Sequence, residues 1–352
     1  MTNQPIVIDG SQGEGGGQIL RTSVALAAAL GKSVRVVNIR SNRRPGGLRP
    51  QHLSAVQAVA RVCHGRLSGD QVDSREILFE PGPVESGEYH LDIGTAGSTT
   101  LVAQTLLPPL ALSGGDSRIT VTGGTHNPWA PCFEYLRDVF GLLVTASNLE
   151  VYFELERAGF YPAGGGRLRM DVGALEGWDE MDPFRYAERG QLRYIEGVSA
   201  VSAGLPAHIA GRQPVAQALG RLAAAGYAAT IEQAAWESDS PGTVLFLRAV
   251  FSRSTAGFFA LGQRGKPAEE VADEAGDQLL DFLSASGAVD EHAADQLITL
   301  AALCPLQTAF TTRRPTGHLR TNALVIRQLT GRETRIEGPP DGPARVVLEE
   351  AQ

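Results

Sequence analysis

Residues 5–40 of the chain read PIVIDGSQGEGGGQILRTSVALAAALGKSVRVVNIR, and this stretch decides the fold class. A short apolar run (PIVID) is followed by a glycine-rich loop, an apolar segment that ends at Gly31, and a run rich in β-branched residues (33–40). This spacing of apolar residues predicts a strand, a loop, a helix and a second strand, in that order. Glycine directly after the apolar segment is a common stop signal, so we expect the helix to end there.

The same order of elements recurs further along the chain. Residues 91–122 contain LDIG, a loop of small residues (TAGSTT), an apolar helix (LVAQTLLPPLAL) and the start of a strand (RITVTG). A less regular third copy begins near residue 291, with ADQLITLAALC as helix and LQTAFTT as strand. Any α/β protein alternates strands and helices, but small-residue loops at two corresponding helix starts favour internal repetition. Repeated β–α units predict an α/β fold.

A block with a different order of elements, residues 187–284, is predicted to be a small inserted α+β domain. Its predicted strands and helices are QLRYIEGVSAVSA, PVAQALGRLAAAG, AATIEQAAW, TVLFLRAVF, GFFALG and PAEEVADEAGDQLLDFLSA. The turn residues Asp-Ser-Pro-Gly at 239–242 predict a hairpin between two of these strands. Residues 1–186 and 285–340 then form one discontinuous catalytic domain, and 341–352 is expected to be a tail with one edge strand.

Composition excludes several classes of protein. With 352 residues, of which 43% are hydrophobic, the chain can bury the core of one large domain or two. A net charge of −8 argues against a protein that coats nucleic acid, so any nucleic-acid site must be a local patch. The isolated Cys63, Cys132 and Cys304 predict neither a disulfide framework nor a zinc site. The absence of a signal-peptide pattern and of a long apolar run predicts a cytoplasmic protein without a membrane partner.

The glycine-rich loop GSQGEGGGQ (10–18) is the first candidate for chemistry. Glycines between a strand and a helix let backbone N–H groups approach an anion, and a helix N-terminus favours negative charge. The loop has neither the Gly-Lys-Ser/Thr of a Walker A motif nor the spacing of a dinucleotide fingerprint. A flexible turn is the plainer interpretation, but Glu14 in the loop and Arg21 soon after it favour a phosphate or metal site.

A second candidate is the loop RSNRRPGGLRPQH (40–52), which has four arginines in a stretch stiffened by proline. Guanidinium groups bind phosphate through paired hydrogen bonds, so a rigid cluster of them suits a phosphate site. A solvated surface loop is the alternative interpretation, because most runs of charge have no further role.

Among the seven histidines, only His318 has a sequence context that indicates catalysis. It lies in PTGHLRTN (315–322), immediately before the apolar segment ALVIRQLTG, for which Thr321 or Asn322 is the expected N-cap. A positive imidazolium is disfavoured near a helix N-terminus, which would keep the ring neutral and nucleophilic. His126 and His292 are expected in polar loops, as secondary contacts.

Together these segments resemble the RNA 3′-terminal phosphate cyclases, in order and over nearly the whole chain. The shared segments are DGSQGEGGGQILR, RPGGLRPQH, IGTAGSTTLVAQTLLP, GGTHNPWAP, GFYPAGGG, ADQ and HLRTN. The resemblance implies a large domain of three βαβαββ repeats with a small inserted α+β domain. It also implies ATP-dependent conversion of an RNA 3′-phosphate to a 2′,3′-cyclic phosphate, through a covalent AMP–histidine and an RNA(3′)pp(5′)A intermediate.

The resemblance also assigns roles to residues of this chain. It makes His318 the nucleophile that accepts AMP, and it associates Glu14 with a divalent metal, Mg²⁺ or Mn²⁺. The residues that it implies for binding ATP and phosphate groups are Arg21, Arg40, Arg43, Gln51, Gln104, His292, Ala293, Ala294, Asp295 and Gln296. The implied partners are ATP and RNA 3′-phosphate ends. This chain departs from the family pattern at His292, where relatives commonly have tyrosine, and at His126, where they usually have aspartate.

Three other functions are compatible with parts of this pattern. A non-catalytic cyclase-like RNA-binding or ribosome-assembly factor would share the fold, but such relatives lack the histidine of the HLxTN motif. An enolpyruvyl transferase also consists of repeated β–α units, but it needs no covalent nucleotide. A purely structural protein would not need these loops. The sequence leaves the natural RNA, the preferred metal and the oligomeric state open.

Overall fold

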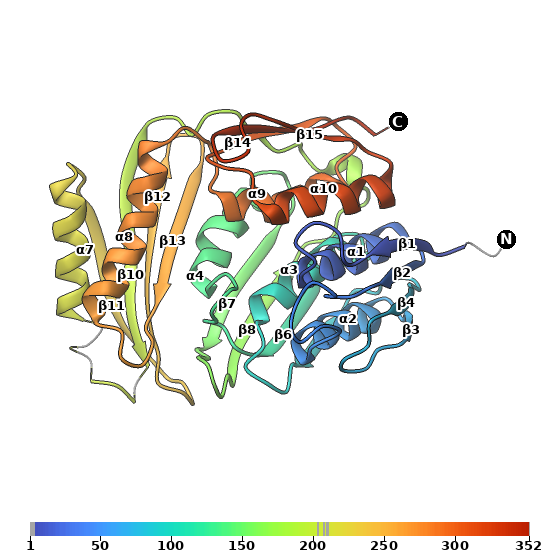
Figure 1. The fold of residues 1–352 in the computed structure, drawn as a ribbon, viewed down its shortest axis with the longest axis horizontal. Helices are drawn as coiled ribbons and strands as arrows, with labels where there is room; N and C mark the ends of the chain where they lie inside the picture. Colours follow the sequence, from blue (N-terminus) through green and yellow to red (C-terminus); the bar gives the residue numbers. More distant parts are fainter. Residues whose placement is uncertain (1–3, 203, 207, 209–210, 352) are drawn as a thin grey trace.

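The computed structural model describes residues 4–202, 204–206, 208 and 211–351, which contain both helices and strands throughout (Figure 1). Within these residues the strands form four sheets of four strands each. Helices combined with mixed sheets confirm the predicted α/β fold class. No helix in the described ranges is both long enough and apolar enough to cross a bilayer.

Three of the sheets belong to units with the same order of elements. The first unit contains β1 (Ile6–Asp9), α1 (Gly17–Leu30), β2 (Val34–Val37), α2 (Pro50–Val62), β3 (Arg66–Ser68) and β4 (Ile77–Glu80). The second contains β5 (Glu88–Asp92), α3 (Thr99–Leu110), β6 (Ser117–Gly123), α4 (Phe133–Tyr135), η1 (Leu136–Gly141), α5 (Leu142–Thr145), β7 (Val151–Arg157) and β8 (Gly166–Val172). After the short η2 (Trp178–Glu180), the third contains β9 (Arg185–Tyr186), α9 (Glu291–Ala301), β14 (Thr308–Thr312), α10 (Gly317–Thr330), β15 (Thr334–Glu337) and β16 (Ala344–Leu348).

Strand pairing is also the same in each unit. The first strand is parallel to the second, the second is antiparallel to the fourth, and the fourth is antiparallel to the third. The resulting orders are β1-β2-β4-β3, β5-β6-β8-β7 and β9-β14-β16-β15. Because element order and the direction of pairing are repeated, the chain contains three βαβαββ repeats.

The fourth sheet interrupts the third repeat between β9 and α9. Its elements are β10 (Leu192–Ser202), α7 (Arg212–Ala224), β11 (Ala229–Trp236), β12 (Thr243–Phe251), β13 (Thr255–Leu261) and α8 (Ala268–Ser284). One face of the sheet carries α7 and α8 over a core of its own (Figure 1). The other face adds Val244 and Phe246 to the core of the repeats. We propose 187–284 as the inserted domain.

The predicted hairpin at 239–242 is wrong, because β11 and β12 are not neighbours. The strand order is β11-β10-β12-β13, with β10 parallel to β11 and antiparallel to β12. The turn instead contacts the second repeat, where Arg157 pairs with Asp239 at 2.7 Å and Ala163 N donates to Ser240 Oγ at 2.9 Å. Residues that favour a turn do not specify which strands pair.

Two further expectations for strands are corrected. The C-terminal strand β16 is an interior strand, hydrogen-bonded to both β14 and β15, and is not an edge strand. Residues 33–40 do not form one long strand, because β2 ends at Val37. Asn38 and Arg40 have positive φ angles of 53° and 52°, a backbone conformation outside the β region.

Helices of different repeats pack against one another in the interior. Helix α1 contacts α2, α3 and α10, and α9 contacts α10 and α3. In Figure 1, α9 and α10 lie between the β14–β15 sheet and α1. A buried hydrogen bond of 2.8 Å from Thr22 Oγ1 of α1 to Asn322 Oδ1 of α10 fixes the two helices side by side. This packing brings the N-terminal ends of helices from the first and third repeats together.

We expect Arg332→Leu to lower the free energy of unfolding by about 2–3 kcal/mol. The Arg332 side chain is only 5% exposed. Its guanidinium donates to the carbonyl oxygens of Ala301, Ala302, Cys304, Leu306 and Glu349, which ties the end of α9 to the C-terminal segment. Leucine would leave these buried acceptors without donors, and urea denaturation measures the cost.

The matched control is Arg327→Leu on the last turn of α10. The Arg327 side chain is 65% exposed and pairs with Glu333 at 2.9 Å, so its loss is expected to change stability by less than about 0.5 kcal/mol. Equal losses in the two variants would contradict the proposed anchoring role of Arg332.

Candidate active site

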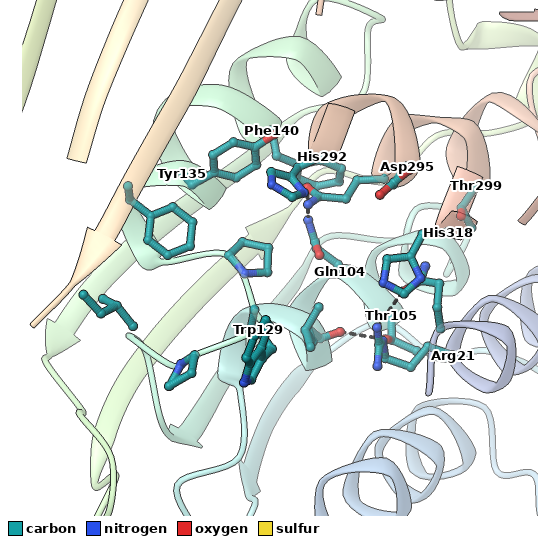
Figure 2. Close-up of a pocket in the computed structure, with 18 of the residues that line it drawn as sticks. Arg21, Gln104, Thr105, Trp129, Tyr135, Phe140, His292, Asp295, Thr299 and His318 are labelled. Atoms are coloured by element: carbon teal, nitrogen blue, oxygen red, sulfur yellow. Dashed lines mark hydrogen bonds between the residues drawn. The ribbon is translucent and has the colours of Figure 1, made fainter. Parts of the chain in front are cut away.

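A cavity of about 500 Å³ opens between the repeats and the inserted domain (Figure 2). Helices α1, α3, α9 and α10 form one side, and β13 with α8 forms the other. The polar side chains that line it include Gln18, Arg21, Thr22, Gln104, Thr105, Gln263, Lys266, Gln278, His292, Asp295, Gln296, Thr299 and His318. The apolar and aromatic ones include Leu101, Pro128, Trp129, Pro131, Tyr135, Phe140, Phe259, Leu261 and Leu300. Such a mixture suits a ligand with both an aromatic and an anionic part.

The glycine-rich loop lies directly against the start of α10. Glu14 N donates to Thr321 Oγ1 at 3.3 Å, although the two residues are 307 positions apart. A β-carbon at Gly13 would overlap the Thr321 hydroxyl, and one at Gly317 would overlap the Glu14 carboxylate. Glycine at these two positions therefore permits the close approach that brings Glu14 to His318.

Helix α10 begins earlier in the sequence than expected. Its N-cap is Thr316, whose hydroxyl accepts from Leu319 N at 3.0 Å and also donates to the Asp295 carboxylate. The expected N-caps are wrong, because Thr321 and Asn322 lie inside the helix. Thr321 Oγ1 donates to Gly317 O at 2.8 Å, and Asn322 Nδ2 donates to Asp295 O at 2.8 Å. His318 is thus in the first turn of α10.

The two ring nitrogens of His318 have different surroundings. Nδ1 is buried and lies 3.0 Å from Glu14 Oε2, whereas the side chain as a whole is 44% exposed. Burial lowers the pKa of His318 below its ordinary value of 6.5. Glu14 opposes this shift, and the cations Arg21 and Arg43 contribute to it. At neutral pH the imidazole is therefore uncharged.

Arg21 supplies positive charge inside the cavity. Burial lowers the pKa of Arg21 to about 10, so its guanidinium still carries a charge at neutral pH. Nη2 donates to Gln18 Oε1 at 2.5 Å, and no carboxylate within the described part of the chain pairs with it. Arg21 is partly buried, and a partly buried cation without a counter-ion is costly, so an anionic ligand would compensate it.

His52 lies next to Arg21, and the sequence did not indicate that it belongs to the site. Burial, together with Arg21, Arg40 and Arg49, lowers the pKa of His52 to about 3, so the ring is neutral. Its Nδ1 accepts from Arg49 N at 3.3 Å, at the first turn of α2. The segment RPGGLRPQH contains this residue, but only the fold shows that its ring is buried next to Arg21.

Helix α9 brings the predicted nucleotide-binding segment to the cavity. Asp290 is its N-cap and accepts from His292 N at 3.0 Å, Ala293 N at 2.9 Å and Tyr135 Oη at 2.6 Å. His292 is consequently helical and does not lie in a polar loop. Its ring meets that of Tyr135 edge to face, with centroids 6.3 Å apart.

The side chains of the segment point in different directions. Gln104 Nε2 donates to Gln296 Oε1 at 2.6 Å across the cavity wall, and burial raises the pKa of Asp295 well above its usual value (Figure 2). The side chains of Ala293 and Ala294 are fully buried in the hydrophobic core and do not line the cavity. Helical periodicity therefore selects His292, Asp295 and Gln296 as the cavity-facing residues.

The arginine-rich loop lies beside the cavity and does not line it. Arg40 Nη1 donates to the carbonyl oxygens of Pro45 and Gly47 at 3.0 and 3.3 Å, so this side chain braces its own loop. Arg43 is half-exposed, with Nη2 3.9 Å from Glu14 Oε2. Gln51 is exposed in the first turn of α2. Of this group, Arg43 is the residue placed next to Glu14.

His126 lies in the loop between β6 and α4, as expected, but it is buried and does not line the cavity. Nε2 lies 2.9 Å from the buried Glu134 Oε2, and the ring packs against Phe160 and Trp236. It therefore joins the second repeat to the inserted domain.

Several lining residues were missed from the sequence, chiefly Trp129, Tyr135, Phe259 and Lys266. Trp129 lies in the segment GGTHNPWAP, which the chain shares with the cyclase family, so this motif could have indicated the residue. Phe259 and Lys266 belong to the inserted domain, and only the fold brings them next to the repeats.

The described residues offer few protein ligands for a divalent metal. The described residues contain no group of three or more histidine, cysteine or acidic side chains suited to hold an ion. Glu14 offers one partly exposed carboxylate beside His318 and Arg43. Mg²⁺ is commonly held by one or two carboxylates together with substrate phosphates, and this arrangement fits Glu14.

Comparison with known proteins gives a consistent result. Residues 12–336 match the family model described as RNA 3′-terminal phosphate cyclase. A relative of that name from Methylococcus capsulatus is 45% identical over 326 residues, which are 91% of this chain and 89% of the relative. Relatives of the same name from Trichormus variabilis and Thermococcus kodakarensis are 41% and 40% identical, covering 91% and 97% of this chain and 93% and 98% of their own.

Proposed function

Because the chain belongs to the RNA 3′-terminal phosphate cyclase family, we propose that it converts an RNA 3′-phosphate to a 2′,3′-cyclic phosphate with ATP. The observation that supports this most directly is the position of His318. Its ring lies at the start of α10, at the cavity surface, with Nδ1 3.0 Å from Glu14 Oε2.

The proposed nucleophile is Nε2 of His318. The buried Nδ1 lies 3.0 Å from Glu14 Oε2 without forming a hydrogen bond to it. The nearby carboxylate favours a proton on Nδ1, which leaves the lone pair on the other nitrogen. The lowered pKa of the ring keeps this lone pair available at neutral pH. In this proposal Glu14 favours the tautomer through its negative charge.

In the first proposed step, Nε2 attacks the α-phosphorus of ATP. A P–N bond to AMP forms, and the bond from the α-phosphorus to the bridging oxygen breaks, so pyrophosphate leaves with the electron pair. Arg21 would stabilise the negative charge in the transition state, since its cation is already held without a counter-ion. His292, Asp295, Gln296 and Gln104 would contact the nucleoside from the cavity wall.

Glu14 would hold the divalent metal together with phosphate oxygens of the substrate. A bound Mg²⁺ or Mn²⁺ would neutralise negative charge on these oxygens. Arg43, next to Glu14, would bind a phosphate group there, and Arg40 and Gln51 of the same loop and the following helix would contribute from beside the cavity.

In the second step, an oxygen of the RNA 3′-phosphate attacks the phosphorus of the AMP–histidine and releases the neutral imidazole. In the third, the 2′-oxygen attacks the activated 3′-phosphorus, loses its proton to solvent and expels AMP. The last reaction is intramolecular, and good orientation can lower such a barrier by roughly 7–11 kcal/mol. A missing 2′-hydroxyl would stop the third step, so cyclisation requires RNA.

The proposal is tested by incubating the purified protein with ATP labelled at the α-phosphate and Mg²⁺ or Mn²⁺. We expect label on the denatured protein that is stable to alkali and released by acid, as a phosphoramidate should be, and none when EDTA is present. Addition of a 3′-phosphorylated oligoribonucleotide should discharge the label and yield a 3′ end that resists phosphatase.

A folded protein that binds ATP but takes up no label with either metal would contradict the proposed mechanism. It would favour a non-catalytic RNA-binding relative of the cyclases.

A further inference from the structure

The loop between β6 and α4 carries an unusual aromatic residue at the cavity. Trp129 is 101% exposed, the highest value among the exposed large hydrophobic side chains of the described chain, and it nevertheless lines the cavity. Its φ angle is 66°, in the left-handed region that a bulky side chain rarely adopts. An exposed indole on a strained backbone is unfavourable in the free protein, and such strain is concentrated at functional sites.

The residues before Trp129 are firmly held. Thr125 N and His126 N donate to Gly159 O at 2.9 and 3.1 Å, and His126 pairs with Glu134. Asn127 Nδ2 donates to Ala96 O. The indole is therefore presented to solvent by a rigid support, which limits the entropy lost when a ligand stacks on it.

The cavity has an enclosed part and a rim, and these suit different substrates. Tyr135 and Phe140 are 0% and 2% exposed and lie in the enclosed part with His292 (Figure 2). Trp129 and the exposed Pro128 lie at the rim, as does Gln263 of the inserted domain. A mononucleotide can be enclosed completely, whereas an RNA chain must continue into solvent and cross the rim.

We propose that Trp129 is a stacking platform for a base among the last two nucleotides of the RNA substrate. This inference rests on the proposed function and adds a determinant of acceptor binding to it. Every nucleobase has a π-face, so such a platform binds RNA ends without selecting a sequence. That property suits an acidic protein that recognises only an RNA end, because stacking does not require positive charge.

The test compares Trp129→Ala with the wild-type protein in two separate reactions. We expect kcat/KM for a 3′-phosphorylated oligoribonucleotide to fall by about 5- to 100-fold, mainly through KM. Self-adenylylation by ATP without RNA should stay within about twofold of wild type. Trp129→Phe should restore most of the RNA affinity, and Tyr152→Ala, which removes an aromatic side chain that is 57% exposed outside the cavity, should change neither reaction.

Substrates with an abasic residue at the last or the second-last position identify the stacked base. One of these substrates should bind wild type more weakly than intact RNA does, by the same factor that Trp129→Ala weakens binding of intact RNA. Trp129→Ala should bind this abasic substrate and intact RNA equally well. A loss of self-adenylylation in Trp129→Ala would show that the indole contacts ATP. Unchanged kinetics with RNA would show that the indole does not contribute to RNA binding. Either result overturns the proposal.

A binding measurement tests the role of Trp129 independently of whether the protein catalyses the proposed reaction. Oligoribonucleotide should quench the tryptophan fluorescence of wild type and much less that of Trp129→Phe, even if no AMP adduct forms. Equal quenching in both proteins would contradict the role of Trp129 whatever the fate of the proposed mechanism.

Discussion

The variant His318→Ala is expected to form no AMP adduct and to lose cyclisation by at least about 10⁴-fold. Alanine removes the atom that forms the P–N bond, and the other histidine at the cavity, His292, packs against Tyr135 instead of Glu14. Transfer of label from α-labelled ATP to denatured protein measures the first effect. Conversion of 3′-phosphorylated RNA measures the second.

The control for this experiment is His90→Ala. His90 is exposed on β5, 3.8 Å from Glu88 and outside the cavity, so this variant should be labelled like wild type. Because the His318 side chain is 44% exposed, we expect its removal to change thermal stability little. Full labelling of a folded His318→Ala protein would exclude this residue as the nucleophile.

The variant Arg21→Met is expected to reduce self-adenylylation by roughly 10²- to 10³-fold, the usual effect of removing a group that stabilises transition-state charge. Methionine keeps much of the side-chain length without the charge. Burial has already lowered the pKa of Arg21 to about 10, and no ion-pair partner exists among the described residues. Removing this cation should therefore leave the free energy of unfolding unchanged or raise it, while activity falls.

The two measurements are single-turnover labelling and urea denaturation of the same preparation. Arg21→Lys should recover part of the activity, because it restores the charge but not the paired N–H groups. Arg66→Met, at a side chain that is 82% exposed, should alter neither quantity. Normal labelling by Arg21→Met would contradict a role in stabilising phosphate charge.

Local patterns in the sequence were sufficient for most elements of the fold. The glycine stop of α1 is confirmed, since Gly31 has a φ of 63° and its N–H bonds to Ala27 O and Ala28 O. Apolar runs also located the strands of the inserted domain, and β12 covers the same residues as TVLFLRAVF. These features depend on residues close together in the chain, so a sequence pattern records them directly.

These local patterns did not determine which strands pair with one another. The residues of β10 that separate β11 from β12 lie earlier in the chain, so nothing in the turn at 239–242 indicates them. The C-terminal β16 became an interior strand for a similar reason, because both of its neighbours are chosen by packing within the third repeat.

The site divides in the same way. Motifs in the sequence singled out Glu14, Arg21 and His318 as separate candidates, because glycine, arginine and histidine in those contexts have recognisable chemistry. Only the tertiary structure decided that Glu14 lies 3.0 Å from Nδ1 of His318, that Ala293 and Ala294 face the core, and that Trp129 stands exposed at the rim. The physical reason is that a side chain's chemistry is local, whereas its partner, burial and pKa depend on helices from different repeats that pack together in the folded chain.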